Sequence, residues 1–152
     1  MNWDALGAIG EIVGALAVVV TLVFLTRQLS EHTKGLKLQA LQSTFDSWDN
    51  LLKELQDPNG VGPALGKAQR NEELNEDEKH ALNFWYRRAL NVNDKVHYLH
   101  KIGSADEFNH GAFERNLPYI VNNKFFEEWW SQSKNRYSKR FQDYIREISN
   151  GL

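Results

Sequence analysis

Cysteine is missing from the chain, since none of its 152 residues is one. Disulfide bonds therefore cannot stabilise the fold, which is typical of a domain in a reducing compartment. Net charge is also nearly absent, because 18 basic residues stand against 20 acidic ones and the formal charge is −2. Asp4 and Glu11 precede the first basic residue, so the charge is balanced from Arg27 onward. A protein that binds duplex nucleic acid needs a basic face, and this balance argues against such a partner.

Signals of strands and of catalysis are absent too. No segment alternates apolar and polar residues as a half-buried strand does. The stretch from Gly62 to Lys67 is only superficially similar to a phosphate-binding loop, because Ala68 follows it and no predicted strand precedes it. The nucleophile motif G-x-S-x-G does not occur. We therefore predict an all-α protein with no catalytic residues, no cofactor and no enzymatic activity.

The longest pattern that is present is an apolar run from Ala5 to Leu25, which contains one carboxylate, Glu11. At about 1.5 Å per residue, a helix of this length spans the roughly 30 Å hydrocarbon core of a bilayer. No Lys or Arg precedes the run and no A-x-A cleavage site follows it, which favours a retained membrane helix over a signal peptide. Basic residues follow the run, so the positive-inside rule predicts an outside N-terminus and a cytoplasmic C-terminal domain.

One face of this helix combines the carboxylate with small residues. At about 100° per residue, Gly7, Glu11, Gly14 and Val18 lie on the same side. Small residues let membrane helices approach closely, so this face predicts a homo-oligomer in the lipid bilayer with Glu11 turned inward. A ring of such carboxylates would line a cation-conducting pore. The alternatives are a protonated Glu11 that is hydrogen-bonded between helices, or one that reaches toward the membrane surface, and neither needs conduction.

The remainder of the chain predicts a small helical bundle. We expect a membrane helix over residues 1–27, a stalk or first amphipathic helix over 28–56, and a cytoplasmic helical domain over 57–152. Prolines and glycines in residues 57–63 end the first helix. Asn75 is the predicted N-cap of a helix that runs to Lys101 and stops at Gly103. The apolar side chains predicted to form the buried face of the first amphipathic helix are Leu38, Leu41, Phe45, Trp48, Leu52 and Leu55.

Two groups that mix aromatic and basic residues suggest a ligand site. Arginine beside an aromatic ring suits phosphate binding and base stacking, so a small anion or a nucleotide is a candidate ligand. In the first group Arg87 points away from the face that its neighbours share, so we leave it out. The selected residues are Trp85, Arg88, Arg136 and Arg140. The alternatives are solvated faces around core aromatics and, for the second group, contact with anionic lipid headgroups.

A histidine pair offers a weaker pattern. His97 and His100 lie three residues apart, after Asp94, and Glu107 and His110 could complete a metal site from the next helix. Pairs with this spacing are common by chance, so we predict no metal site.

The N-terminal sequence resembles an uncharacterised family of small bacterial single-span membrane proteins. The resemblance covers NWDALGAIGEIVGA from Asn2 to Ala15 and runs on to Gln28. Family members open with a near-identical N-W-x-A-I-G-A-I-G-E stretch. They close with a Trp-rich helix and a basic-aromatic tail, to which Phe126–Trp130 and Phe141–Ile145 are similar. The resemblance implies a location in the bacterial inner membrane, and the family has no assigned activity to carry over. The architecture is also similar to membrane effectors of phage defence, which implies an alternative role as a tethered scaffold or a ligand- or nucleotide-sensing protein.

Overall fold

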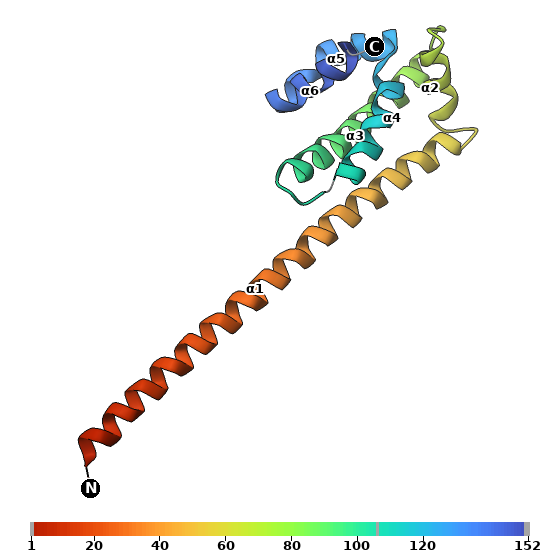
Figure 1. Ribbon diagram of the computed structural model, residues 1–152. Helices are drawn as coiled ribbons and strands as arrows, with labels where there is room; N and C mark the ends of the chain where they lie inside the picture. Colours follow the sequence, from red (N-terminus) through yellow and green to blue (C-terminus); the bar gives the residue numbers. More distant parts are fainter. Residues whose placement is uncertain (1, 106, 151–152) are drawn as a thin grey trace. The chain divides into compact units, whose positions relative to one another are not determined.

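The computed structural model describes residues 2–105 and 107–150, except for the side chains of residues 4–6, 107–110, 112 and 150. In these ranges the chain forms helices and no strand, so the all-α prediction is confirmed. Figure 1 shows their order along the chain. The helices are α1 (Trp3–Gln56), α2 (Gly62–Gln69), α3 (Glu76–Lys101), α4 (Glu107–Val121), α5 (Lys124–Ser133), the 3-10 helix η1 (Lys134–Arg136) and α6 (Lys139–Asn150).

The chain divides between Ala40 and Leu41 into two compact units. This division lies inside the segment 28–56 that the sequence assigns to a stalk. The predicted boundaries at 27/28 and 56/57 stay predictions.

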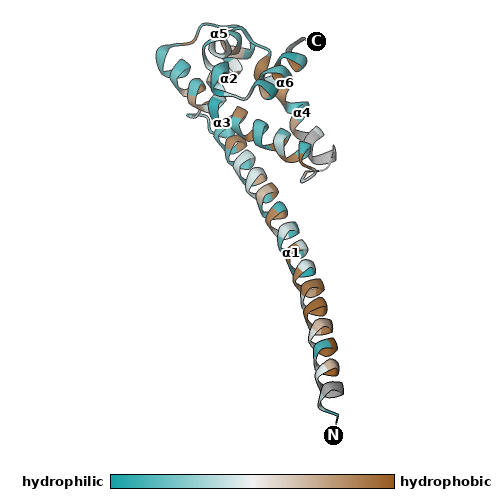
Figure 2. Ribbon diagram, turned by 90° about the vertical axis from the view of Figure 1, so that its left-hand side faces the viewer, coloured by the Kyte–Doolittle hydropathy of each residue, from teal (hydrophilic) through white to brown (hydrophobic). Residues whose placement is uncertain are grey.

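The first unit is built from α1 alone, and its apolar side chains are uncovered. The large hydrophobic residues from Ile9 to Leu25 are between 52% and 67% exposed. Figure 2 shows this part of α1 as a nearly continuous hydrophobic segment. By its length and composition, this helix can serve either as a membrane span or as a signal sequence.

The turn after α1 depends on close backbone approach. The amide of Gly60 donates to the carbonyl of Asp57 at 2.9 Å, and α2 begins at Gly62 with a proline in its first turn. A Cβ on Gly62 would overlap the carbonyl oxygen of Leu55, so only glycine fits there. The predicted break at 57–63 is therefore confirmed.

The ends of α3 also follow the sequence. Asn75 Oδ1 accepts from the amide of Glu78 at 2.8 Å, and Glu78 Oε2 accepts from the amide of Asn75 at 2.9 Å. This capping box satisfies two amides that the first helical turn would otherwise leave unpaired. At the other end Gly103 has a φ of +66°, a left-handed conformation that glycine adopts without strain.

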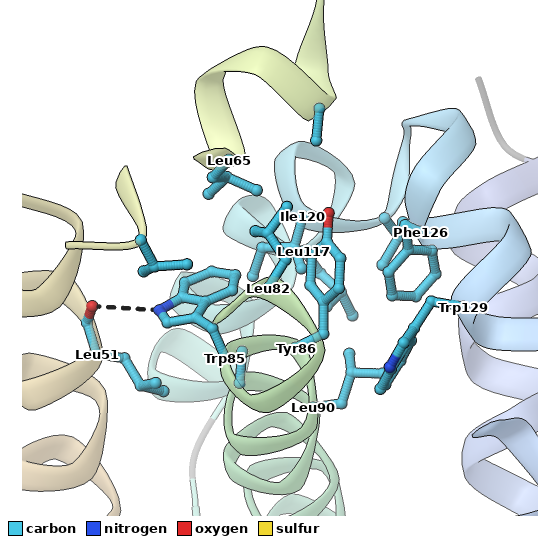
Figure 3. Packing of buried hydrophobic residues seen from close by; sticks show 14 of the residues in the cluster. Leu51, Leu65, Leu82, Trp85, Tyr86, Leu90, Leu117, Ile120, Phe126 and Trp129 are labelled. Atoms are coloured by element: carbon cyan, nitrogen blue, oxygen red, sulfur yellow. Dashed lines mark hydrogen bonds between the residues drawn. The ribbon is translucent and has the colours of Figure 1, made fainter. Parts of the chain in front are cut away.

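The core of the second unit surrounds α3, as Figure 3 shows. Tyr86 is fully buried, and its hydroxyl donates to Asn123 Oδ1 at 3.2 Å. The same oxygen accepts from the amide of Phe126 at 2.8 Å and so caps α5. Asn123 Nδ2 also donates to the carbonyl of Ile120 in α4 at 3.0 Å, so this single buried amide side chain links three helices. The apolar residues around it include Leu51, Leu65, Leu82, Trp85, Leu90, Leu117, Ile120, Phe126, Trp129, Phe141 and Ile145.

The buried face of α1 confirms the predicted stripe in part, since Phe45 and Trp48 pack against Phe113 and Leu55 packs against the core. Leu38, which lies in the first unit, is 69% exposed. In the second unit Leu52 is 38% exposed, whereas Thr44 and Leu51 are each only 1% exposed. The 3–4 spacing of apolar residues allows two neighbouring phases of the helix, and the sequence alone does not choose between them. Packing against Trp85 selects the phase that buries Leu51, whose carbonyl lies 3.5 Å from the indole nitrogen of Trp85.

Candidate functional site

The Glu11 face of α1 has no partner among the residues that the structure describes. A Cβ placed on Gly7, Gly10 or Gly14 would meet nothing within 4 Å. Glu11 is exposed, and no described side chain forms an ion pair or a hydrogen bond with it. Val18, on the same side, is 58% exposed. The face therefore keeps its small residues and its carboxylate free for groups outside this chain.

Trp85 and Arg88 are engaged inside the second unit. The indole ring of Trp85 belongs to the core and is only 3% exposed, so it offers no open face to a ligand. Arg88 Nη1 lies 2.5 Å from Glu54 Oε1, which neutralises its charge at the surface. The structure therefore does not bring Trp85 and Arg88 together with the other two selected arginines.

Arg136 and Arg140 instead belong to a second group of residues, which we call the Tyr137 cluster. It contains Arg87 and Asp94 from α3, and Arg136, Tyr137 and Arg140 from the chain around the start of α6. Arg87 and Asp94 share a face of α3 because they are two helical turns apart.

Aromatic rings hold two of the guanidinium groups of the cluster. The guanidinium carbon of Arg87 lies 5.8 Å from the ring centre of Phe84. That of Arg140 lies 5.4 Å from the ring centre of Tyr98, which connects α6 to α3. Both distances are within the range of a cation–π interaction, which orients a guanidinium without using its N–H donors.

Several polar atoms of the cluster are enclosed without a partner. Arg87 Nε, Asp94 Oδ1, the Tyr137 hydroxyl and Arg140 Nε have almost no solvent contact and no hydrogen bond within the part of the chain that the structure describes. An enclosed polar atom left unpaired typically costs about 1–3 kcal/mol. Each of these atoms needs a partner such as an ordered water or an ion, or else is held at a cost in stability.

The electrostatics of the cluster favour an anion. Burial raises the pKa of Tyr137 to about 12, against the opposing charges of Arg87 and Arg136. Burial also raises the pKa of Asp94, and here the charge of Arg140 acts in the opposite direction. Three guanidinium groups and one carboxylate leave an excess of two positive charges when Asp94 is ionised.

The sequence found part of this cluster. It selected Arg136 and Arg140, and it excluded Arg87 because that residue points away from Trp85. The same geometry keeps Arg87 out of the core, and its charge acts on the Tyr137 hydroxyl. The usable signal was the seven-residue spacing from Arg87 to Asp94, which places a cation and an acid on one helix face.

A second basic region lies in a groove of about 520 Å³ along α5 and α6. Buried Phe126 and Ile145 contribute to its lining, and Lys139 and Arg146 are also part of it. These two cations already lie 3.6 Å and 2.9 Å from carboxylate oxygens of Asp143. The groove therefore has less unmatched charge than the Tyr137 cluster.

His97 and His100 do not form a metal centre with other side chains that the structure describes. Nδ1 of His100 lies 3.2 Å from the carbonyl oxygen of Ala105, to which it donates when it carries the hydrogen. Within the described residues no three metal-binding side chains gather around one point. The side chains of Glu107 and His110 lie outside the described residues, so the absence of a metal site stays a prediction.

Two regions of the molecule thus have groups for which the described chain supplies no contact or hydrogen-bond partner. One is the apolar helix with its carboxylate, and the other is the enclosed basic cluster around Tyr137. Compared with known proteins, the chain matches no family model, no curated protein and no solved structure.

Proposed function

We propose that α1 anchors this protein in the bacterial inner membrane as a single span, with the N-terminus outside and residues 28–152 in the cytoplasm. The observation that carries the proposal is the uncovered apolar surface between Ile9 and Leu25, where each large side chain is more than half exposed. Burying one such side chain is worth roughly 1.5–3 kcal/mol, so a bilayer stabilises the whole segment strongly. Arg27, Lys34 and Lys37 follow the segment, which supports the orientation.

The span also self-associates in this proposal, through the face formed by Gly7, Glu11, Gly14 and Val18. Support comes from the open space around these glycines, which lets a second helix approach closely. A carboxylate at membrane depth costs roughly 2.5–3.5 kcal/mol, and a shared polar interface offsets that cost. The resulting ring of Glu11 side chains lines a path for cations. The proposal gives the chain no enzymatic activity.

Topology is the first test, and the absence of native cysteine makes it direct. Single cysteines replace Asn2 or Ser131, and spheroplasts are treated with a membrane-impermeant maleimide. The proposal predicts labelling of Asn2→Cys in intact spheroplasts and labelling of Ser131→Cys only after lysis. A purified chain that has lost its N-terminal segment identifies a cleaved signal sequence and contradicts the proposal.

Cation flux through liposomes tests the pore. We expect flux with the wild-type protein and loss of most of it with Glu11→Gln. Glu31→Gln is the matched control, because Glu31 lies on the same helix and pairs with Lys34 at 2.9 Å. Equal and negligible flux in all three proteins removes the pore, and chemical crosslinking in the same liposomes then decides whether the helices associate.

A tethered ligand-sensing protein is the second candidate function. The Tyr137 cluster supports it, because its unpaired polar atoms and three guanidinium groups are suited to a polar, anionic partner. In this role α1 is mainly an anchor. Glu11→Ala distinguishes the two candidates, since it disrupts assembly and conduction in the first and leaves ligand binding unchanged in the second.

A further inference from the structure

The groove along α5 and α6 is elongated, because one face of each helix lines it. Its lining residues recur at helical spacing, from Glu127 to the C-cap residue Lys134 along α5 and from Lys139 to Ser149 along α6. Residues three or four positions apart lie on the same side of a helix. At about 1.5 Å per residue, the two rows are roughly 10 Å and 15 Å long.

The inner side of the groove is apolar. Phe126 and Ile145 line it as parts of the core, and they are 2% and 1% exposed. Trp130 also lines the groove, and its ring lies 5.9 Å from that of Phe126 with the two planes 15° apart. The volume of about 520 Å³ is within the range of small-molecule sites, roughly 300–1,000 Å³. The groove can therefore hold an apolar ligand of that size.

Lys134 gives the groove a positive charge that the described chain does not pair. No carboxylate in the described ranges lies within 4.0 Å of its Nζ atom. The other two lining cations, Lys139 and Arg146, both pair with Asp143. Lys134 follows the last residue of α5 and Lys139 begins α6, so both lie at the turn between the helices. This end of the groove is suited to the charged head of an anion.

The balance of charges favours an anion with a single charge. The groove and its ion pairs contain three cations, and Glu127 and Asp143 are their two carboxylates. One positive charge is left over. A carboxylate head matches this excess, whereas a phosphate monoester carries about −1.5 to −2 at neutral pH.

The shape of the groove favours a chain as the apolar part of the ligand. An extended acyl chain can follow two rows of side chains for about 10–15 Å, along the direction of the helices. Its methylenes would cover Phe126 and Ile145, and each buried methylene contributes favourably to binding.

We propose that this groove binds a fatty acid, with its carboxylate at Lys134 and its acyl chain along Phe126, Trp130 and Ile145. The ligand is thus an amphipathic monoanion, bound by one ion pair and by apolar contact. All of these residues belong to the second unit, so the proposal does not rest on the role of α1.

Photoaffinity labelling of the full chain tests the site. The protein is held in phosphatidylcholine nanodiscs, and the probe is a decanoate analogue that carries a diazirine on its chain. We expect labelled peptides within residues 121–149, and suppression of this labelling by excess decanoate. That suppression separates saturable binding from probe that is dissolved in the bilayer. Absence of suppressible labelling in these peptides overturns the proposal.

Two competitors with the same chain test the charge of the head. Decanol is uncharged and decyltrimethylammonium is a cation, and both are used below the concentrations at which micelles form. Decanol should compete about threefold to fivefold less well than decanoate, because one ion pair at an exposed lysine contributes modestly. Decyltrimethylammonium should compete less well still. Equal competition by all three compounds overturns the role of Lys134.

Matched variants locate the two parts of the ligand. Lys134→Gln should weaken competition by decanoate about threefold to fivefold. Lys124→Gln removes an equally exposed charge from the start of α5, outside the groove, and should leave competition unchanged. Equal losses in the two variants would mean a general charge effect and would overturn the proposal.

Ser131→Leu fills the groove and should abolish suppressible labelling, whereas Gln132→Leu, at the next residue and outside the lining, should not. Normal labelling of Ser131→Leu contradicts the proposal. Thermal unfolding shows whether each variant is folded. If Ser131→Leu is not, Lys134→Gln provides the test, because no described group pairs with the side chain that it removes.

Discussion

The two units place the same kinds of residue in opposite surroundings. Leu16 in the first unit is 60% exposed, whereas Leu90 and Leu117 in the second are fully buried. The second unit thus buries its apolar residues with its own chain, as a small globular domain does. The first unit has nothing of its own to cover Leu16, so its surroundings must supply the apolar contact.

Glycine shows the same contrast. Gly62 lies against the backbone of α1, where any side chain would collide with Leu55. A Cβ on Gly7, Gly10 or Gly14 would meet no atom within 4 Å in the part of the chain that the structure describes. In one region glycine fits an existing contact, and in the other it leaves room for a contact with another molecule.

The largest expected difference concerns a matched pair of phenylalanines. Phe126 is 2% exposed and Phe24 is 59% exposed. Phe126→Ala should lower the free energy of unfolding of the second unit by about 3–5 kcal/mol, because it leaves a cavity in the core. Phe24→Ala should leave that free energy unchanged. Chemical unfolding in detergent, followed by tryptophan fluorescence, measures both, and equal losses would show that the two regions unfold together.

A charge placed in the first unit sharpens the comparison next. Leu16→Arg should lower the proportion of protein that stays in membranes after alkaline extraction, because an arginine at the centre of a span costs roughly 2.5–3.5 kcal/mol. Leu36→Arg is the control on the same helix, at a residue that is 54% exposed, and it should not lower the proportion of protein retained in membranes. Equal retention of both variants would contradict a span over residues 5–25.

How much the sequence predicts depends on whether a feature is local. The capping box at Asn75 and the stop at Gly103 need only neighbouring residues, and both are confirmed. The buried face of α1 was predicted only in part, because the burial of Leu51 in place of Leu52 depends on packing against Trp85, a residue distant in the sequence.

The candidate site follows the same division. Arg136 and Arg140 were visible as a basic-aromatic stretch of sequence. For Arg87 the spacing to Asp94 was the only local signal, since its approach to Tyr137 follows from the packing of α6 against α3, which no local pattern gives. The Glu11 face was predictable because a helix places residues by spacing alone.

A smaller effect tests the contrast between the glycines. Gly62→Ala should destabilise the second unit by about 1–3 kcal/mol, because its new methyl group meets the backbone of Leu55 and the turn must shift. Gly14→Ala should leave this unfolding transition unchanged, since nothing lies within 4 Å of its Cβ. Urea midpoints of the two variants make the comparison. A full-sized loss in Gly14→Ala would show that α1 is already packed in the folded chain.

The smallest effect concerns the pH dependence of the second unit. Lys67 donates to Glu78 Oε1 at 2.6 Å and the amide of Asn75 donates to Oε2, so the pKa of Glu78 lies below its ordinary value of about 4.5. Because this pKa is lower in the folded chain, the ionised carboxylate stabilises the fold at pH values above its pKa in the unfolded chain. The stabilisation is lost as the pH falls through its pKa in the folded chain. Stability should therefore fall below about pH 4.5, and Glu78→Gln should make that fall shallower. Glu147→Gln, an exposed change on α6, should leave the slope as it is. Urea midpoints between pH 7 and pH 3 measure it, and identical slopes in all three proteins would mean that other carboxylates control the acid response.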